Sequence, residues 1–182
     1  IKLSQVTQNA EALVSQAVKD LNSQGAQSFV LDIRDNPGGY LTQAVDVTGL
    51  FLRSGKLVAL RTPDGATTRD ASGNQIATAP LVVIVNGNTA GTEEVIAGAM
   101  KDSDRATIVG ENTMGRGCVQ SIRELSFGGA LRYTSAYYYT PKGYAINDVG
   151  IVPNIVVNPD NNPDVDSQKK FAIELAHSQA AL

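Results

Sequence analysis

Residues 81–120 read LVVIVNGNTAGTEEVIAGAMKDSDRATIVGENTMGRGCVQ, and this stretch decides the fold. The apolar, β-branched run Leu81–Val85 predicts a buried strand, and the turn residues Asn86-Gly87-Asn88 end it. A helix is expected from about residue 92 to 101, because apolar residues recur there at helical spacing. A second apolar run, Ala106–Val109, leads into the glycine-rich GENTMGRG. A strand that feeds a helix through a sharp turn presents backbone N–H groups that can hold an oxyanion or a carboxylate.

The flanking segments extend this alternation of strands and helices. Glu93 and Glu94 are expected to complement the positive end of the helix that they begin. Helices are predicted at 7–24, with Thr7 as its cap and Gly25 at its end, and at about 41–52 and 167–181. Strands are predicted at 1–6, 29–33, 57–61, 121–125 and 130–139, with a hairpin or exposed loop in 62–80 and an irregular edge strand in 149–157. Such alternation between 26 and 110 implies a parallel or mixed sheet with helices packed on it.

At NTAGTEEVIAGAM and GENTMGRGCVQ the chain resembles the catalytic core of the C-terminal processing peptidases, also called tail-specific proteases. LDIRDNPGG, at residues 31–39, resembles the signature loop of the same family. These are serine peptidases with a Ser/Lys dyad, usually assisted by a glutamine. The resemblance implies an α/β fold shared with the ClpP and crotonase families: a mixed sheet with packed helices and an added β-hairpin region. It covers residues 1–158 as a core domain, and it leaves 159–182 as a linker and a C-terminal helix.

The resemblance also assigns the site residues. Gly91 stands at the position of the nucleophilic serine, and Arg116 stands 25 residues later at the position of the lysine base. Gln120 retains the position of the assisting glutamine. The oxyanion donors are expected to be the backbone of Gly38 or Gly39 and the backbone of Thr92.

The residues at these positions do not suit the family's chemistry. Glycine has no attacking group, and an arginine stays protonated and cannot take up the proton of a nucleophile. Thr89 and Thr92 carry nearby hydroxyls, but Thr92 is rotated by about 100° from position 91, and Thr89 is expected to cap the turn or the helix. Cys118 is interpreted as a small buried residue, because the only histidine, His177, lies in the last predicted helix and is expected to face solvent. Asp32 and Arg34 are interpreted as a structural ion pair, and residues 137–139 (YYY) as sheet packing.

Three functional hypotheses follow. In the first, the domain is a catalytically impaired relative that still binds peptides or partners, with Arg116 able to hold a peptide carboxylate in a bidentate way. In the second, it is an active peptidase that uses another nucleophile, or an engineered glycine stands at position 91. In the third, it is an acyl-CoA enzyme of the crotonase class, which shares the fold but not these motifs.

The composition argues against several classes of function. The chain has 182 residues, 42% of them hydrophobic, and a net charge of −3, which argues against a nucleic-acid surface. No apolar stretch reaches membrane-spanning length. One histidine and one cysteine offer no metal cluster, so neither a metal nor a cofactor is expected. By resemblance, we expect protein C-terminal tails as partners, a PDZ domain upstream in the full-length protein and an extracytoplasmic location, and a homo-oligomer is left open.

Overall fold

The computed structural model describes residues 1–162 and 164–181, and its centre is a four-stranded, all-parallel sheet. We call it the core sheet. Its strands are rich in β-branched residues, and all five residues of β4 are buried, as expected for a parallel sheet covered on both faces. The strands follow in the spatial order β1 (Phe29–Asp32), β4 (Leu81–Val85), β5 (Thr107–Gly110) and β8 (Ile155–Val156).

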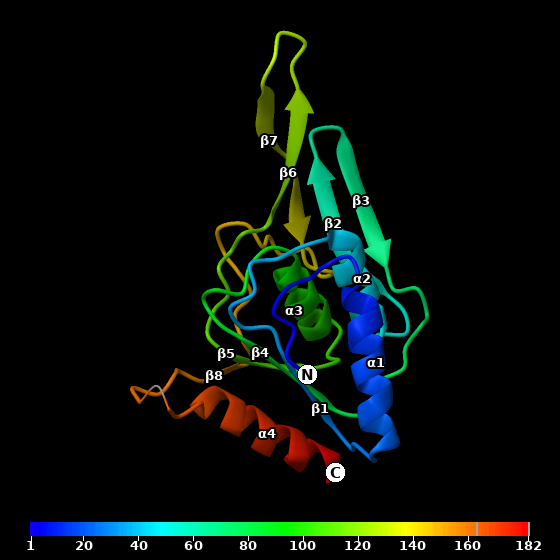
Figure 1. The fold of residues 1–182 in the computed structure, drawn as a ribbon, viewed down its shortest axis with the longest axis vertical. Helices are drawn as coiled ribbons and strands as arrows, with labels where there is room; N and C mark the ends of the chain where they lie inside the picture. The colour runs from blue at the N-terminus through cyan, green and yellow to red at the C-terminus, as the bar shows by residue number, and fades with distance from the viewer. Residues whose placement is uncertain (163, 182) are drawn as a thin grey trace.

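Helices cover both faces of the core sheet (Figure 1). Three helices lie on one side: α1 (Ala10–Ser23), α2 (Leu41–Gly49) and α3 (Thr92–Asp102). The fourth, α4 (Ser167–Ala180), lies on the other side and contacts β1, β4 and β5. Alternate side chains of β4 serve the two cores, because Val83 packs with the three helices while Val82 and Ile84 pack against α4.

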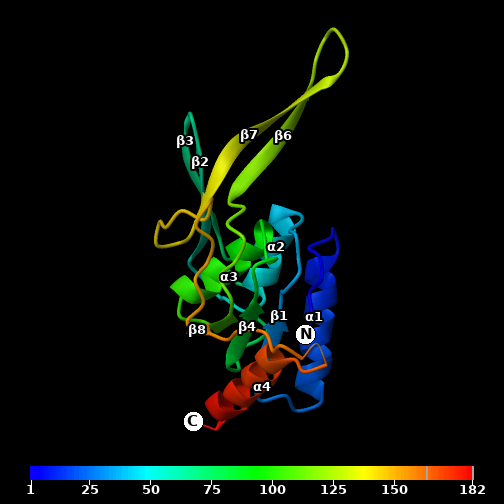
Figure 2. The same cartoon turned by 90° about the vertical axis from the view of Figure 1, so that its left-hand side faces the viewer.

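A second four-stranded sheet is antiparallel and projects away from the body (Figure 2). We call it the arm sheet. Its edge strand β3 has all six residues exposed. The sheet joins two hairpins, and its strands are β2 (Lys56–Thr62), β3 (Gly65–Asp70), β6 (Cys118–Glu124) and β7 (Ala130–Tyr139), in the spatial order β3-β2-β7-β6.

The prediction that segments 29–33, 81–86 and 106–110 share one sheet is confirmed, and helix α3 packs beside that sheet. The parallel strands form one sheet and the antiparallel strands form the other. Segment 57–61 belongs to the arm sheet, because it pairs antiparallel with β3 and β7. The predicted hairpins near Gly65 and at 127–129 are present, and β8 is an edge strand.

The predicted cap at Thr7 is wrong. Helix α1 begins at Ala10, its N-cap residue is Asn9, and the Thr7 hydroxyl donates to Asn9 Oδ1 (2.7 Å) instead of to the helix. The expected strand at residues 1–6 forms only isolated bridges, which pair Lys2 with Asp32 and Val6 with Gly39.

Within residues 1–162 and 164–181, no helix is both long enough and apolar enough to span a membrane. The polar linker expected at residues 160–166 includes Pro163, which lies outside the described residues, as does Leu182 in the C-terminal segment 159–182.

Candidate active site

Three loops meet at the carboxyl edge of the core sheet, where open α/β sheets hold their ligands. Residues 33–40 follow β1, residues 86–91 follow β4, and residues 111–117 follow β5. All the site residues predicted from the sequence lie in these loops, at the start of α3 or at the start of β6.

The loop after β4 makes a sharp turn that ends at Gly91. The Thr89 hydroxyl closes this turn, since it donates to Ile33 O (3.0 Å) and accepts from Asn86 N (3.0 Å). Gly91 has φ 68° and ψ −121°, the conformation of the first central residue of a type II′ turn. In other hydrolases a strand–turn–helix of this shape exposes the nucleophile at its tip. The backbone at position 91 therefore has the shape that such chemistry needs, without a side chain.

The space beside Gly91 is open enough for a side chain. A Cβ atom built there would meet nothing nearer than Pro37 O at 3.5 Å and Gly38 Cα at 3.6 Å, which are ordinary van der Waals distances. It would point toward the loop after β1. A serine at position 91 would consequently fit, although the positive φ strains any residue other than glycine.

Glu94 joins the turn at Gly91 to the loop of Arg116. Its carboxylate is fully buried and accepts four hydrogen bonds. Oε2 accepts from Gly91 N (3.0 Å) and Arg116 N (2.7 Å), and Oε1 accepts from Gly115 N (2.7 Å) and the Thr113 hydroxyl (2.6 Å). The backbones of the predicted nucleophile and base positions thus share one carboxylate oxygen.

Gln120 is not joined to this cluster. It lies on β6, exposed, and its side-chain amide donates to Thr134 Oγ1 (2.7 Å) and to Cys118 Sγ (3.3 Å), both within the arm sheet. The Arg116 side chain is also exposed. The structure therefore brings together Gly38, Gly39, Gly91, Thr92 and the backbone of Arg116, while the role of Gln120 stays a prediction.

The N–H groups of the two predicted glycine donors are occupied by partners inside the protein. Gly38 N donates to Asn36 Oδ1 (3.2 Å), and Gly39 N donates to the Thr92 hydroxyl oxygen (2.9 Å). A Cβ on Gly38 would lie 3.4 Å from Thr92 N, so this N–H group is close to the glycine loop. An oxyanion or carboxylate that used either glycine N–H would have to displace one of these contacts.

Glu93 is a buried acid whose place the sequence analysis missed. It is fully buried, its Oε2 accepts from the Thr92 hydroxyl (3.1 Å), and its Oε1 has no partner among the described residues. Burial raises the pKa of Glu93 from 4.5 to about 7. From the sequence, the two adjacent acids at the helix start were interpreted only as partners of the helix dipole. The only signal against this was the small apolar sequence around them, which leaves α3 buried on every side.

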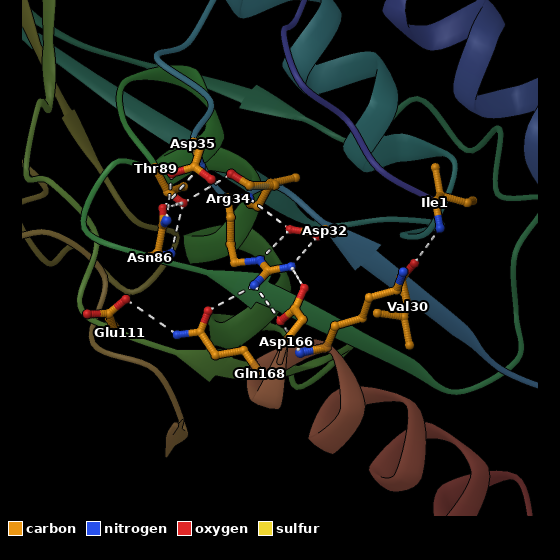
Figure 3. Close-up of polar contacts among 12 residues, drawn as sticks. Ile1, Val30, Asp32, Arg34, Asp35, Asn86, Thr89, Glu111, Asp166 and Gln168 are labelled. Carbon is orange, nitrogen blue, oxygen red and sulfur yellow. Dashed lines mark hydrogen bonds and ion pairs between the residues drawn. The ribbon is translucent and has the colours of Figure 1, made fainter. Parts of the chain in front are cut away.

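A second polar cluster ties the loop after β1 to α4 (Figure 3). The Arg34 guanidinium binds Asp32 (Nη2–Oδ2, 2.7 Å) and Asp166 (Nη1–Oδ1, 2.8 Å; Nη2–Oδ2, 2.7 Å), and Nη1 also donates to Gln168 Oε1 (3.1 Å). The predicted Asp32–Arg34 ion pair is confirmed. The hydrogen bonds from Arg34 hold the pKa of Asp166 down at about 2.

Asp35 crosslinks two of the three loops. Its Oδ1 accepts from Asn86 Nδ2 (2.8 Å) and Asn88 Nδ2 (3.0 Å), and its backbone N donates to Asn86 Oδ1 (3.1 Å). The hydrogen bond from Asn88, and after it the one from Asn86, lower the pKa of Asp35. The loops after β1 and β4 are therefore held in register by polar contacts as well as by the sheet.

The other residues considered from the sequence lie outside the three loops of the candidate site. Cys118 is half-buried and His177 is exposed on α4. Tyr138 is buried as predicted, but Tyr137 is 44% exposed. Within residues 1–162 and 164–181, His, Cys, Asp and Glu form no cluster of three that could hold a metal ion.

Taken together, a sharp strand–turn–helix that faces a glycine loop at the edge of a parallel sheet has the frame of a serine-type peptidase domain. The sequence model of Peptidase family S41 matches residues 1–157, and the chain belongs to this family. It is a peptidase domain of the C-terminal processing kind, as its relatives indicate.

Curated relatives agree over most of this chain. The carboxyl-terminal-processing protease of Synechocystis sp. is 42% identical over 158 residues, which are 86% of this chain and 37% of that protein. The carboxy-terminal-processing protease of Bartonella bacilliformis is 38% identical over 186 residues, covering 98% and 42%. The chain thus spans less than half the length of these relatives.

Solved structures agree as well. The photosystem II D1 C-terminal processing protease superposes with a TM-score of 0.85 at 37% identity, covering 99% of this chain and 46% of that one. A peptidase from Parabacteroides merdae, at 16% identity and a TM-score of 0.77, shares the fold.

Proposed function

We propose that this domain is a catalytically impaired C-terminal processing peptidase that binds protein C-terminal tails without cleaving them. The observation that carries the proposal is Gly91, a residue without an attacking group at the tip of a nucleophile-type turn. The ancestral reaction is hydrolysis of a peptide bond near a protein C-terminus through an acyl-enzyme.

The two nearest hydroxyl groups support impairment. Thr89 is fully buried, and its hydroxyl is committed to Ile33 O and Asn86 N within the turn. Thr92 is 3% exposed, and its hydroxyl is held between Gly39 N and the Glu93 carboxyl. An attack by either hydroxyl would break contacts that shape the site, so neither is a ready substitute for a serine.

Arg116 adds a second, independent loss. A lysine at that position could act as a base if its pKa were lowered, whereas a guanidinium keeps its proton. Arginine is, however, a good partner for the carboxylate at the end of a peptide, because its N–H groups match the two oxygens. The exposed Arg116 side chain beside the Gly91 turn is suited to hold a bound tail.

The remaining features of the proposal follow from the family. The partners would be protein C-terminal tails, since the printed names of the relatives describe C-terminal processing. We propose an extracytoplasmic location; four of the curated relatives are named as chloroplastic. Under the same proposal residues 1–158 are the peptidase core, the full-length protein carries an upstream PDZ domain, and the backbone groups of Gly38, Gly39 and Thr92 receive the ligand oxygen with help from Gln120.

A time course on a disordered reporter peptide tests the proposal. It compares the chain as given with Gly91→Ser and with Gly91→Ser combined with Arg116→Lys. We expect no turnover by the unmodified chain, almost none by the single variant, and the largest rate from the double variant, because only that variant has both a nucleophile and a base. Binding of the same peptide is measured in parallel by fluorescence anisotropy.

Two results would overturn the proposal. The first is peptide cleavage by the unmodified chain. If this activity copurified with the chain, and the chain reacted with a serine-directed phosphonate, the domain would be an active peptidase with another nucleophile. Binding of coenzyme A in place of peptide would favour the crotonase-like alternative.

A further inference from the structure

Glu93 lies behind the glycine loop of the candidate site. Its side chain is fully buried, and its Oε2 accepts a hydrogen bond from the Thr92 hydroxyl (3.1 Å). The oxygen of the same hydroxyl accepts from Gly39 N (2.9 Å). A Cβ built on Gly38 would lie 3.6 Å from Glu93 Oε2, so the carboxyl is also close to the loop itself. The predicted oxyanion donor at Gly39 is thus joined to a buried acid through one hydroxyl group.

Glu93 has no counter-ion that would stabilise a negative charge. Its Oε1 has no hydrogen-bond partner, and no basic side chain pairs with it within residues 1–162 and 164–181. Glu94, next to it on α3, carries a charge of the same sign, and the oxygens of Glu94 have four donors of their own. Burial, with a smaller effect from Glu94, raises the pKa of Glu93 to about 7.

The charged side chains on the elements and loops around α3 leave this carboxyl alone. Among the described residues, none of them forms a hydrogen bond or an ion pair with Glu93. They are Arg34 and Asp35 after β1, Asp46 on α2, Lys56 and Arg61 on β2, and Arg116 after β5. The charge of Glu93 is therefore controlled by its own proton.

That proton determines what the Thr92 hydroxyl can do. When Glu93 is ionised, its oxygens can only accept, and the Thr92 hydroxyl donates to Oε2. When Glu93 is protonated, its own O–H can donate to Thr92 Oγ1, and the hydroxyl proton of Thr92 is released for another acceptor. A ligand oxygen beside Gly39, which is exposed, would then gain a donor.

A bound carboxylate would also act on Glu93 through its charge. An oxygen that accepted from Gly39 N or from the Thr92 hydroxyl would lie within two hydrogen bonds of Glu93 Oε2. Two carboxylates at such a distance favour a state in which one of them holds a proton. The C-terminal carboxyl of a peptide is ordinarily the stronger acid, so the proton goes to Glu93. A neutral amide oxygen at the same place would have no such effect.

From these contacts we propose that Glu93 makes the binding of a tail carboxylate at the glycine loop depend on a proton. The site binds a free C-terminus tightly while Glu93 is neutral and weakly once Glu93 is ionised. One proton passes from solvent to Glu93 as the carboxylate enters and returns to solvent as it leaves. Glu93 is a positioning residue, because it acts through Thr92. The proposal rests on the proposed function, since it names the chemical group of the tail that the loop holds.

Peptide binding followed by fluorescence anisotropy between pH 5.5 and 8.5 tests the proposal. The probe is a short, N-terminally labelled peptide of alanine, leucine and serine with a free C-terminal carboxylate, and the matched probe ends in an amide. Each is titrated with the unmodified chain, Glu93→Gln and His177→Gln. His177 is the matched control, because histidine is the residue type that ordinarily changes charge in this range, and this one is exposed on α4, across the core sheet from α3. Circular dichroism verifies that the variants are folded.

We expect the unmodified chain and His177→Gln to bind the carboxylate probe about ten-fold more tightly at pH 5.5 than at pH 8.5, which corresponds to about one unit of linkage. The affinity for the amide probe should change by less than about two-fold. In Glu93→Gln the side chain cannot ionise, so the affinity for the carboxylate probe should no longer depend on pH.

A second measurement needs no variant. Calorimetry of the carboxylate probe at pH 7, in two buffers of different ionisation enthalpy, counts the protons exchanged on binding by the unmodified chain. Because Glu93 is about half protonated there before binding, we expect an uptake of about 0.4 proton for each peptide bound.

Four results would overturn this proposal and leave the proposed function intact. They are binding without proton uptake, equal pH dependence for the two probes, a pH dependence that Glu93→Gln retains, and one that His177→Gln abolishes. Failure of both probes to bind the unmodified chain at every pH would overturn this proposal and the proposed function together.

Discussion

The core sheet and the arm sheet differ in where their polar groups find hydrogen-bond partners. All five residues of β4 in the core sheet are buried, whereas all six of β3 in the arm sheet are exposed. At the edge of the core sheet, polar groups must find partners inside the protein, and Glu94 has four donors for that reason. The six exposed side chains of β3 on the arm can have water as their partner. Substitutions should therefore be costly around the three loops and nearly silent for stability on the arm.

The largest effect is expected from Glu94→Ala. This change removes the acceptor of the backbone N–H groups of Gly91, Gly115 and Arg116, of which Gly115 is buried, and we expect a loss of about 3 kcal/mol in the free energy of unfolding. Urea denaturation measures it. Glu124→Ala, on the exposed strand β6, is the matched control and should stay within about 0.5 kcal/mol of the parent. Similar losses in the two variants would break the contrast between the sheets.

Glu93→Gln should change how stability depends on pH. Because the pKa of Glu93 is raised to about 7 in the folded protein, the native state binds more protons than the unfolded chain between about pH 4.5 and 7. Stability is then highest below the unfolded pKa, falls as pH rises through this window by up to about 3 kcal/mol, and is constant above it.

In the variant this slope should flatten, while the unpaired amide costs about 1–3 kcal/mol at low pH. Unfolding curves at pH 5 and pH 8 for both proteins measure the difference. A slope that Glu93→Gln leaves unchanged would show that another group carries it.

A smaller effect is expected at the junction of Arg34 and α4. Asp166→Asn keeps an N-cap side chain for Lys169 N but loses the charge that pairs with Arg34, and we expect a loss of about 1 kcal/mol or less, since Asp166 is partly exposed. Asp166→Ala should cost about 1 kcal/mol more, because the cap is also lost.

The low pKa of Asp166 determines how its contribution to stability changes with pH. Its stabilising contribution is present above pH 3.8 and is lost as pH falls through about 2. The parent and Asp166→Asn should therefore approach each other in stability in strong acid. A gap that persists at pH 2 would contradict the ion-pair account.

The smallest effect is expected at the tip of the arm. Phe127 is 84% exposed, so Phe127→Ser should change the free energy of unfolding by no more than about 0.5 kcal/mol. Thermal unfolding followed by circular dichroism measures it. A loss of more than about 1 kcal/mol would mean that the tip packs against something in solution.

Periodicity in the sequence predicted much of the core sheet, because buried parallel strands have an unmistakable composition. The runs at 81–85 and 106–109 and the helix between them were placed within one or two residues. What periodicity could not supply was the division into two sheets, since segment 57–61 is as apolar as a core strand and pairs with β7 through contacts distant in sequence.

The site was predictable by resemblance but not in its internal contacts. Gly91 and the backbone of Arg116 lie together as the 25-residue spacing suggested. That both are tied to one carboxylate, and that Glu93 is buried beside it without a second partner, depends on how α3 is enclosed from every side. No local pattern encodes such enclosure. The link from Arg34 to Asp166 spans 132 residues, and neither residue signals the other.

If the proposed function is right, the backbone at Gly91 also bears on how a serine would be lost at this position. A side chain held at φ 68° and ψ −121° stores roughly 1–3 kcal/mol of strain, which an enzyme tolerates only while the reaction is under selection. Once that selection is relaxed, a change from serine to glycine removes the strain and so increases the stability of the folded protein. Loss of the serine would then be favoured by its effect on stability, and restoring the serine would cost stability.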